Sequence, residues 1–411
     1  MDPAAAAEQI ERLTWGAEHV VRRAELAERL RTKGRLRVKL GVDPTARDVT
    51  LGWAVPLTKL RQFQDEGHTA VLIIGDFTAR IGDPSGKSDT RPRLSAEEVR
   101  ANAEACIASL LDILSEDNLE VRYNSEWLEP LDLAAILELT SHYTVAQMLE
   151  RDDFAKRYAA QRPISIIEFM YPLCQAYDSV AVRADVELGG TDQLFNLMVG
   201  RDLQRAYGQE PQVALTMPLL VGLDGSNKMS QSLGNYVGIK EAPEEMFGKL
   251  MSIPDRLVGQ YALLAAWLPN DEVAALGAQA AAGGPEAGRA KRRVARAIVA
   301  RYHGEEAAQA AEVAFDRVFK ERGVPEDVPE VDVPTGAIED GQVSLVRALP
   351  ELGLADSRGA ARRLLAGGGV KLNGLTVTEE WIGLAEAAGA LVQVGKRRFV
   401  RLRAPGRAPE G

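Results

Sequence analysis

The feature that most restricts the fold is a nearly continuous apolar run, TAVLIIGD at residues 69–76, bounded by glycine. Such a run is typical of a parallel strand that is buried on both faces. A second strand pattern, RVKLGVD, precedes it at 37–43, and a helix is predicted between the two from about Gly52 to Gly67. Strand, helix and buried strand in this order predict a βαβ unit, so we expect a Rossmann-like, doubly wound parallel sheet in the first half of the chain.

Length and composition restrict the cellular setting. The 411 residues, 46% of them apolar, suffice for two or three domains with separate cores. No apolar run approaches the roughly 18–20 residues that span a bilayer, and the N-terminal MDPAAAAEQIERL has acidic residues where a signal peptide has basic ones. Cys106 and Cys174 lie far apart, without the spacing of a zinc site. We therefore expect a cytoplasmic protein with no metal site of its own.

The sequence predicts several segments beyond the first strands. Residues 214–225 form a strand pattern that leads into a polar, glycine-containing loop, and VPEDVPEVDVPTG at 324–336 is a proline-rich, extended linker. The segment after it predicts two short helices followed by glycine-turned strands. The expected organisation is a catalytic domain at 1–225 with an insertion at about 105–165, a loop at 226–240, a helical domain at 241–323, a linker at 324–340 and a small α+β domain at 341–405.

Charge is distributed unevenly along the chain. The net charge is −10, yet residues from Gly336 to Gly411 contain 11 basic and 8 acidic side chains, which gives +3 there and −13 upstream. A basic tail on an acidic body suggests that any polyanion binds at the C-terminal end.

Four short stretches carry chemically useful groups. GVDPTARDVTLGW, at 41–53, places a strand end and a helix start together, which suits a phosphate but is also a common turn. IGDPSGKSDTRPRL, at 81–94, puts Asp83 after the second strand, either in the same crevice or in a solvated turn. ELGGTDQLFN, at 187–196, allows close backbone approach at its two glycines. GSNKMSQSLGN, at 225–235, is either a surface turn or a mobile functional loop around Lys228.

A stripe of polar side chains is the most specific of these patterns. Tyr171, Gln175 and Asp178 are spaced i, i+4, i+7, so on a helix they share one face. Buried and unpaired, each would cost about 1–3 kcal/mol. A polar small molecule would satisfy them, and so would an internal hydrogen-bond network.

In order and spacing, these motifs resemble the bacterial tyrosyl-tRNA synthetases, which are class I aminoacyl-tRNA synthetases. The resemblance covers nearly the whole chain and includes GVDPTA, IGDPSGKS, the polar stripe, GGTDQ, KMSQS and a C-terminal segment similar to the S4 RNA-binding fold. It implies a tyrosine–tRNA ligase that uses ATP with Mg²⁺ to form tyrosyl-adenylate and then transfers tyrosine to the 3′ end of its tRNA. KMSQS resembles the class I Lys-Met-Ser-Lys-Ser loop, which closes over the phosphates of ATP.

The resemblance also implies a role for each matching residue. Asp178 would accept a hydrogen bond from the phenol of tyrosine, and Lys39 stands where many relatives place a second phenol ligand. The tyrosine-binding residues implied are Lys39, Asp83, Tyr171, Gln175, Asp178 and Gln193. Those implied for ATP are Gly41, Asp43, Thr45, Thr50, Gly52, Trp53, Gly190, Asp192, Lys228, Met229, Ser230, Gln231 and Ser232. Those implied for tRNA are Arg358, Arg362, Arg363 and Lys371.

Besides Lys39, which stands in place of a tyrosine, the chain departs from the family pattern at three positions. The His-x-Gly-His signature is replaced by Thr50-Leu51-Gly52-Trp53, and the second lysine of the loop is Gln231. Trp53 either stacks on adenine or fills the pocket. These departures keep open a catalytically weakened paralog that binds RNA or senses an amino acid, and a change of amino-acid specificity.

Two partners follow from the resemblance. The insertion at about 105–165 resembles the dimer-forming part of the family, which predicts a homodimer. The helical region with Arg289, Lys291, Arg292, Arg293 and Arg296 matches the side that meets the anticodon, although a solvated helix face explains the same charges.

Overall fold

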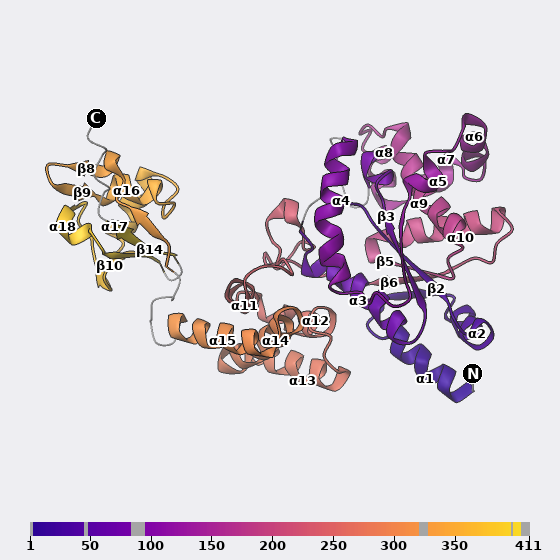
Figure 1. Cartoon of the computed structure of the whole chain (residues 1–411), viewed down its shortest axis with the longest axis horizontal. Coiled ribbons are helices and arrows are strands. Elements are labelled where there is room, and N and C mark those ends of the chain that lie inside the picture. Colours follow the sequence, from indigo (N-terminus) through magenta and orange to yellow (C-terminus); the bar gives the residue numbers. More distant parts are fainter. Residues whose placement is uncertain (1–2, 45–47, 84–94, 320–327, 396–397, 404–411) are drawn as a thin grey trace. The chain divides into compact units, whose positions relative to one another are not determined.

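The computed structural model describes residues 3–44, 48–83, 95–319, 328–395 and 398–403. The chain divides into two compact units, Met1–Ala308 and Gln309–Gly411, which are described separately below. Figure 1 shows the elements of each unit, coloured along the sequence.

A six-stranded sheet is the centre of the first unit, and its strand order is β1-β6-β5-β2-β3-β4. All neighbouring pairs are parallel except β1 with β6, so the predicted doubly wound sheet is confirmed. Every residue of β3 is buried, as the apolar run requires. The strands are β1 (His19–Val21), β2 (Arg37–Val42), β3 (Thr69–Ile74), β4 (Leu119–Tyr123), β5 (Val186–Gly190) and β6 (Val213–Met217).

Helices cover the sheet and connect its strands. The predicted βαβ unit consists of β2, α3 and β3, and α3 buries the apolar face that contains Leu57, Leu60 and Phe63. A capping box at Ser95 starts α4, because its hydroxyl accepts from the N–H of Glu98. The helices of this part are α1 (Pro3–Thr14), α2 (Arg23–Lys33), α3 (Leu51–Asp65), α4 (Ala96–Leu111), α5 (Ser125–Leu128), α6 (Leu133–Ser141), α7 (Val145–Met148), α8 (Asp152–Ala159), α9 (Ile166–Val182) and α10 (Leu194–Ala206).

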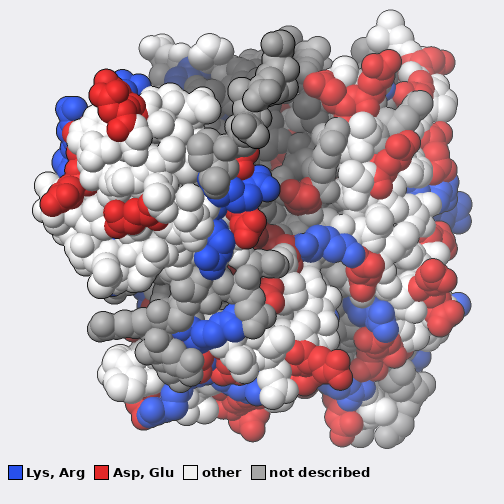
Figure 2. Space-filling model, turned by 60° about the vertical axis from the view of Figure 1, so that its left-hand side comes forward, with Lys and Arg blue, Asp and Glu red and all other residues white. Residues whose placement is uncertain are grey.

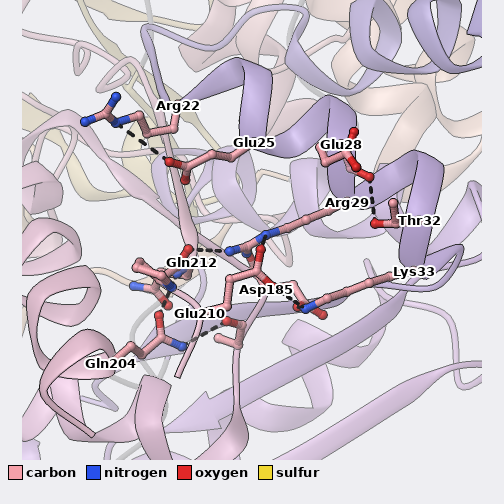
Figure 3. A network of polar contacts seen from close by, with 12 residues as sticks. Arg22, Glu25, Glu28, Arg29, Thr32, Lys33, Asp185, Gln204, Glu210 and Gln212 are labelled. Carbon is pink, nitrogen blue, oxygen red and sulfur yellow. Dashed lines mark hydrogen bonds and ion pairs between the residues drawn. The ribbon is translucent and has the colours of Figure 1, made fainter. Parts of the chain in front are cut away.

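A polar network fixes α2 to the amino ends of β5 and β6 (Figure 3). The guanidinium of Arg29 donates to the backbone carbonyls of Asp185 and Pro211 and lies 3.2 Å from Glu210. The Lys33 ammonium lies 2.7 Å from Asp185 and 3.0 Å from Glu210. Asp185 directly precedes β5, and Pro211 lies two residues before β6, so these contacts brace the edge opposite the strands' carboxyl ends.

The rest of the first unit is helical. Basic residues on α14 are mostly paired there: Arg289 with Glu286, Lys291 with Asp255, Arg293 with Glu272 and Arg296 with Glu305. This pairing favours the solvated-face interpretation of the basic stretch. The helices are α11 (Pro243–Met251), α12 (Val258–Leu264), α13 (Asn270–Ala281), α14 (Gly284–His303) and α15 (Glu305–Phe319), the last of which spans the division between the units.

The second unit is an α+β fold around its own apolar core, which includes Val346, Leu349, Leu365, Val392 and Leu402. Its sheets have the orders β11-β10-β13-β14-β7 and β12-β9-β8. The elements are β7 (Glu330–Asp332), β8 (Ile338–Glu339), β9 (Gln342–Ser344), α16 (Leu345–Glu351), α17 (Arg358–Ala366), β10 (Val370–Leu372), β11 (Leu375–Thr376), β12 (Trp381–Gly383), α18 (Leu384–Ala387), β13 (Leu391–Val394) and β14 (Arg398–Arg403).

One sequence prediction is corrected in this unit. The segment 324–340 was expected to be a linker throughout, but β7 pairs in parallel with β14, and β8 pairs with β9. The prolines do not prevent this pairing, because Pro329 precedes β7 and Pro334 follows it.

Charge and helix length give two further observations. Acidic side chains are spread over the face in Figure 2, with lysine and arginine between them, as the net charge of −10 suggests. In the part of the chain that the structure describes, no helix has the length and apolar character needed to cross a membrane.

Candidate active site

The carboxyl ends of β2, β3 and β5 face the helix that carries the polar stripe. Tyr171, Gln175 and Asp178 all lie on α9, so the spacing read from the sequence places them on one helix face. Ligands of parallel α/β sheets bind outside the carboxyl ends of the strands. Most of the residues predicted to bind tyrosine meet at this edge.

Asp178 lies at the bottom of the site and is 3% exposed. Its Oδ1 accepts from the indole Nε1 of Trp127 at 2.8 Å, and its Oδ2 lies 3.4 Å from Nδ2 of Asn124. Burial raises the pKa of the Asp178 carboxyl to about 7, against the opposing charge of Lys39 and these two hydrogen bonds. A buried carboxylate with an unused acceptor position is suited to receive a hydroxyl proton donor.

Tyr171 connects the stripe to the end of β2. Its hydroxyl donates to Oδ2 of Asp43 at 2.9 Å, and Oγ1 of Thr78 donates to Oδ1 at 2.8 Å. Burial, followed by the negative charges of Asp83 and Asp178, raises the pKa of Asp43 to about 7. Burial raises the pKa of Tyr171 as well, so its hydroxyl keeps its proton at neutral pH.

The side-chain amides of Gln175, Gln193 and Asn196 line one side of the site and form its amide wall. Nε2 of Gln193 donates to Oδ2 of Asp83 at 2.8 Å. Nδ2 of Asn196 donates to Oε1 of Gln175 and to Oε1 of Gln193, at 3.0 Å in each case. Behind them, Arg151 contacts both Asn196 and Asp83. Acceptor oxygens from three residues, one of them a carboxylate, therefore gather at this wall, which suits an ammonium group.

Lys39 differs from its sequence prediction. It is fully buried, and its Nζ lies 2.9 Å from the carbonyl of Gln175, 2.8 Å from Oγ of Ser179 and 2.9 Å from Oε1 of Glu187. Lys39 and Glu187 are direct neighbours in the register of β2 and β5. An ammonium has three N–H donors, so this arrangement leaves none for a substrate phenol and makes Lys39 a support beneath α9.

The segment that replaces the histidine signature begins α3. Thr50 is the N-cap, and its Oγ1 accepts from the backbone N–H of Trp53 at 3.3 Å. Its hydroxyl proton remains a possible donor to a phosphate at this helix N-terminus. Gly52 lies against the loop at 225–235, the lysine loop, because a Cβ there would be 3.4 Å from Cβ of Met229. Trp53 is half-buried in the first turn, which leaves both of its predicted roles open.

The lysine loop contacts the GGTDQ segment. Nζ of Lys228 lies 2.7 Å from Oδ2 of Asp192. A Cβ at Gly190 would lie 2.7 Å from Oδ1 of Asp192 and 2.7 Å from a methyl of Leu219, so both side chains would have to shift to accommodate one. In the neighbouring turn, Nε2 of Gln231 donates to the carbonyl of Asp48 at 2.7 Å.

The loop is itself internally ordered. Oδ1 of Asn235 accepts from the N–H of Ser230 at 2.8 Å, and its Nδ2 donates to the carbonyl of Lys228 at 3.1 Å. Oγ of Ser230 lies 2.9 Å from Oγ of Ser232, and Met229 is buried.

The remaining predicted residues have different positions. Gly41 lies in β2 beside the site, whereas Thr45 falls outside the described residues. Arg358, Arg362 and Arg363 are exposed on α17, and Lys371 is partly exposed on β10. Within the described residues the three arginines form no ion pair, unlike most of the basic side chains of α14.

Several residues of this site were not predicted. Asn124 and Trp127 follow β4. Arg151 directly precedes α8, and Asn196 lies on α10. Each comes from a segment distant in sequence from the polar stripe. Only Asn196 had a signal, since it lies in the quoted ELGGTDQLFN stretch.

Comparisons with known proteins agree on one family. The family described as tRNA synthetases of class I (W and Y) matches residues 31–320. A tyrosine–tRNA ligase of Moorella thermoacetica is 50% identical over 400 residues, which cover 96% of each chain. One from Thermotoga maritima is 46% identical over 395 residues, covering 96% of this chain and 97% of the relative. The crystal structure of a tyrosyl-tRNA synthetase from Archaeoglobus fulgidus, solved with L-tyrosine, has a TM-score of 0.61 at 22% identity and covers 75% of this chain and 99% of that one.

Proposed function

The chain belongs to the class I tRNA synthetases and, among them, to the tyrosine–tRNA ligases, and from this we propose which of its residues carry each step of the reaction. In the first step, the carboxylate of tyrosine attacks the α-phosphate of ATP, and the bond to the β-phosphate breaks to release pyrophosphate. In the second step, a ribose hydroxyl at the 3′ end of the tRNA attacks the carbonyl carbon of tyrosyl-adenylate, and AMP leaves. Neither step needs a protein nucleophile, so positioning and charge stabilisation carry the catalysis.

The observation that carries the assignment to tyrosine is the buried carboxylate of Asp178, held by Trp127 and Asn124. The phenol of tyrosine donates to it, whereas phenylalanine leaves a buried acceptor without a partner. A site built to hydrogen-bond a hydroxyl rejects the analogue that lacks it, and tyrosyl-tRNA synthetases are themselves the standard example of this discrimination.

The α-ammonium of tyrosine occupies the wall formed by Asp83, Gln175 and Gln193, with Tyr171 completing it. One carboxylate and two amide oxygens offer acceptors to the three N–H groups of the ammonium. Tyr171 keeps its hydroxyl proton directed at Asp43, which fixes the ring against the substrate. The carboxylate of tyrosine then points towards the N-terminus of α3.

ATP lies between the start of α3 and the GGTDQ segment. The backbone N–H of Gly52, in the first turn of α3, receives the phosphates together with the hydroxyl of Thr50, because the N–H groups of Leu51 and Trp53 already donate to Val237 and Thr50. Asp192 binds the ribose, and its ion pair with Lys228 opens so that the lysine can meet the pyrophosphate. Mg²⁺ enters with ATP as part of the substrate, and it neutralises phosphate charge while the bond to the leaving group breaks.

The tRNA contacts the second unit. The exposed arginines of α17, Arg358, Arg362 and Arg363, lack acidic partners within the described residues, and Lys371 follows on β10. Lysine and arginine side chains of this kind bind the phosphate backbone of RNA.

We infer a cytoplasmic homodimer. Large apolar side chains are exposed in and next to the insertion, where a partner would cover them, and they are Leu133, Leu137, Val145, Tyr158 and Ile166. Cys106 and Cys174 are buried free thiols, which fits a reducing compartment.

The decisive experiment is ATP–pyrophosphate exchange on the purified protein, with tyrosine, phenylalanine and tryptophan compared at equal concentrations. We expect exchange with tyrosine and almost none with the other two. Exchange driven by tryptophan, or no exchange with any of them, would refute the proposed function.

A further inference from the structure

Arg151 lies immediately behind the amide wall, at the N-cap of α8, and is 5% exposed. Its Nη1 donates to Oδ1 of Asn196 at 3.1 Å, and its Nη2 lies 3.5 Å from Oδ1 of Asp83. Its Nε lies 2.8 Å from Oδ1 of Asp153, and the guanidinium covers the ring of Phe154 at 5.0 Å. The side chain is therefore held in one orientation, with two of its nitrogens directed at the site.

The hydrogen bonds run in a single direction from this arginine. A guanidinium has donors and no acceptor, so the atom of Asn196 that meets it must be the oxygen. The NH₂ group of Asn196 then faces the glutamines, and Oε1 of Gln175 and Oε1 of Gln193 both accept from it. The NH₂ groups of the two glutamines both donate to carboxylates, that of Gln193 to Oδ2 of Asp83 at 2.8 Å and that of Gln175 to Oε1 of Glu187 at 3.2 Å. An amide oxygen has two lone pairs, so a glutamine oxygen can accept from a ligand while it also accepts from Asn196.

We propose that Arg151 is the residue that positions the acceptors for the α-ammonium of tyrosine, a role that rests on the proposed tyrosine activation. It acts through Asn196, by fixing the direction of the amide hydrogen bonds, and through Asp83, by holding the carboxylate at the wall. Arg151 does not touch the substrate itself. Without it, the Asn196 amide can rotate by half a turn, and its oxygen would then face Oε1 of Gln175 and Oε1 of Gln193, which would push these two acceptors away from the ammonium.

A purely structural role for Arg151 predicts a different result. In that case its contacts with Asp153 and Phe154 would only hold the start of α8, and its loss would weaken all ligands of the pocket together. The chain offers a matched control in Arg157, which is also buried on α8 but forms its ion pair with Glu168 at the start of α9.

The test compares two ligands that differ only in the ammonium group. Binding of tyrosine and of 3-(4-hydroxyphenyl)propionic acid, which lacks the amine, is measured by calorimetry on the full-length wild type, Arg151→Met, Arg151→Lys and Arg157→Met. Arg151→Met should weaken tyrosine by at least about tenfold, as expected when a charge-assisted contact is lost, and should change the amine-free analogue by less than about threefold. Arg151→Lys should recover part of the tyrosine affinity, because it restores a donor-only cation. Arg157→Met should change the two ligands equally.

The outcomes separate this inference from the function on which it rests. Equal weakening of both ligands by Arg151→Met, or no effect on either, would overturn the positioning role while wild-type exchange with tyrosine stays normal. If Arg151→Met does not fold, an Arg151→Lys protein that loses no preference for tyrosine over the analogue would also overturn it. A wild type with no tyrosine-dependent exchange would overturn the proposed function and this inference together.

Discussion

Replacing Asp178 with asparagine tests the specificity argument most directly. The side chain keeps its size, but one acceptor oxygen becomes an NH₂ group. Because the indole N–H of Trp127 is directed at Oδ1 at 2.8 Å, the remaining oxygen is held there. The NH₂ group then faces the position that the phenol of tyrosine would occupy, so the variant offers a donor where the wild type offers a charged acceptor.

The magnitude follows from the bond that is lost. Hydrogen bonds to charged groups contribute about 1.5–3 kcal/mol, and about 1.4 kcal/mol corresponds to a factor of ten. Tyrosine should therefore lose roughly 10- to 150-fold in kcat/KM. Phenylalanine should lose nothing, because it made no such bond and no longer buries an unpaired carboxylate.

The assay is ATP–pyrophosphate exchange with each amino acid, from which the ratio of the two kcat/KM values is taken. We expect this ratio to fall by at least about tenfold in Asp178→Asn, with KM for ATP close to that of the wild type. A ratio that stays unchanged would show that the phenol is recognised elsewhere, and a parallel rise in KM for ATP would indicate general damage to the site.

Four further outcomes are expected. The pKa of Asp178 is raised to about 7, so the folded protein binds more protons than the unfolded chain and loses stability as pH rises from about 4 to about 7. Asp178→Asn should therefore raise Tm more at pH 8 than at pH 5. An equal rise in Tm at the two pH values would contradict this. Gln231→Lys should speed adenylate formation in rapid-quench experiments, because it adds a cation beside the leaving pyrophosphate; an unchanged or slower rate would mean that the loop acts without that charge. Leu137→Glu should convert the proposed dimer into a monomer in light scattering, and a wild type that is monomeric at micromolar concentration would refute the proposed dimer. Arg362→Glu should weaken tRNA binding with pyrophosphate exchange unchanged, whereas Arg293→Glu, whose arginine is already paired, should have a smaller effect.

The features that the sequence predicted are those that depend on local periodicity. The run at 69–76 identified a buried parallel strand, and the i, i+4, i+7 spacing placed the three polar residues on one helix face. The sequence predicted that Lys39 contacts the substrate, whereas in the structure it pairs with Glu187. This pairing could not be predicted, because Glu187 lies in a strand whose position next to β2 depends on the order of the sheet. Trp127 and Arg151 were missed for a related reason, since they reach the site through contacts between segments that no short-range pattern joins.

If ATP binds as proposed, it must replace the ion pair between Lys228 and Asp192 with contacts of its own. In the structure, Lys228 lies 2.7 Å from the carboxylate of Asp192, so the two groups that we propose to bind the pyrophosphate and the ribose of ATP already contact each other. Binding then replaces one set of polar contacts with another instead of filling a bare surface. If ATP binds as proposed, a nucleoside without phosphates would have to separate this pair without offering Lys228 a new partner, so it should bind more weakly than ATP.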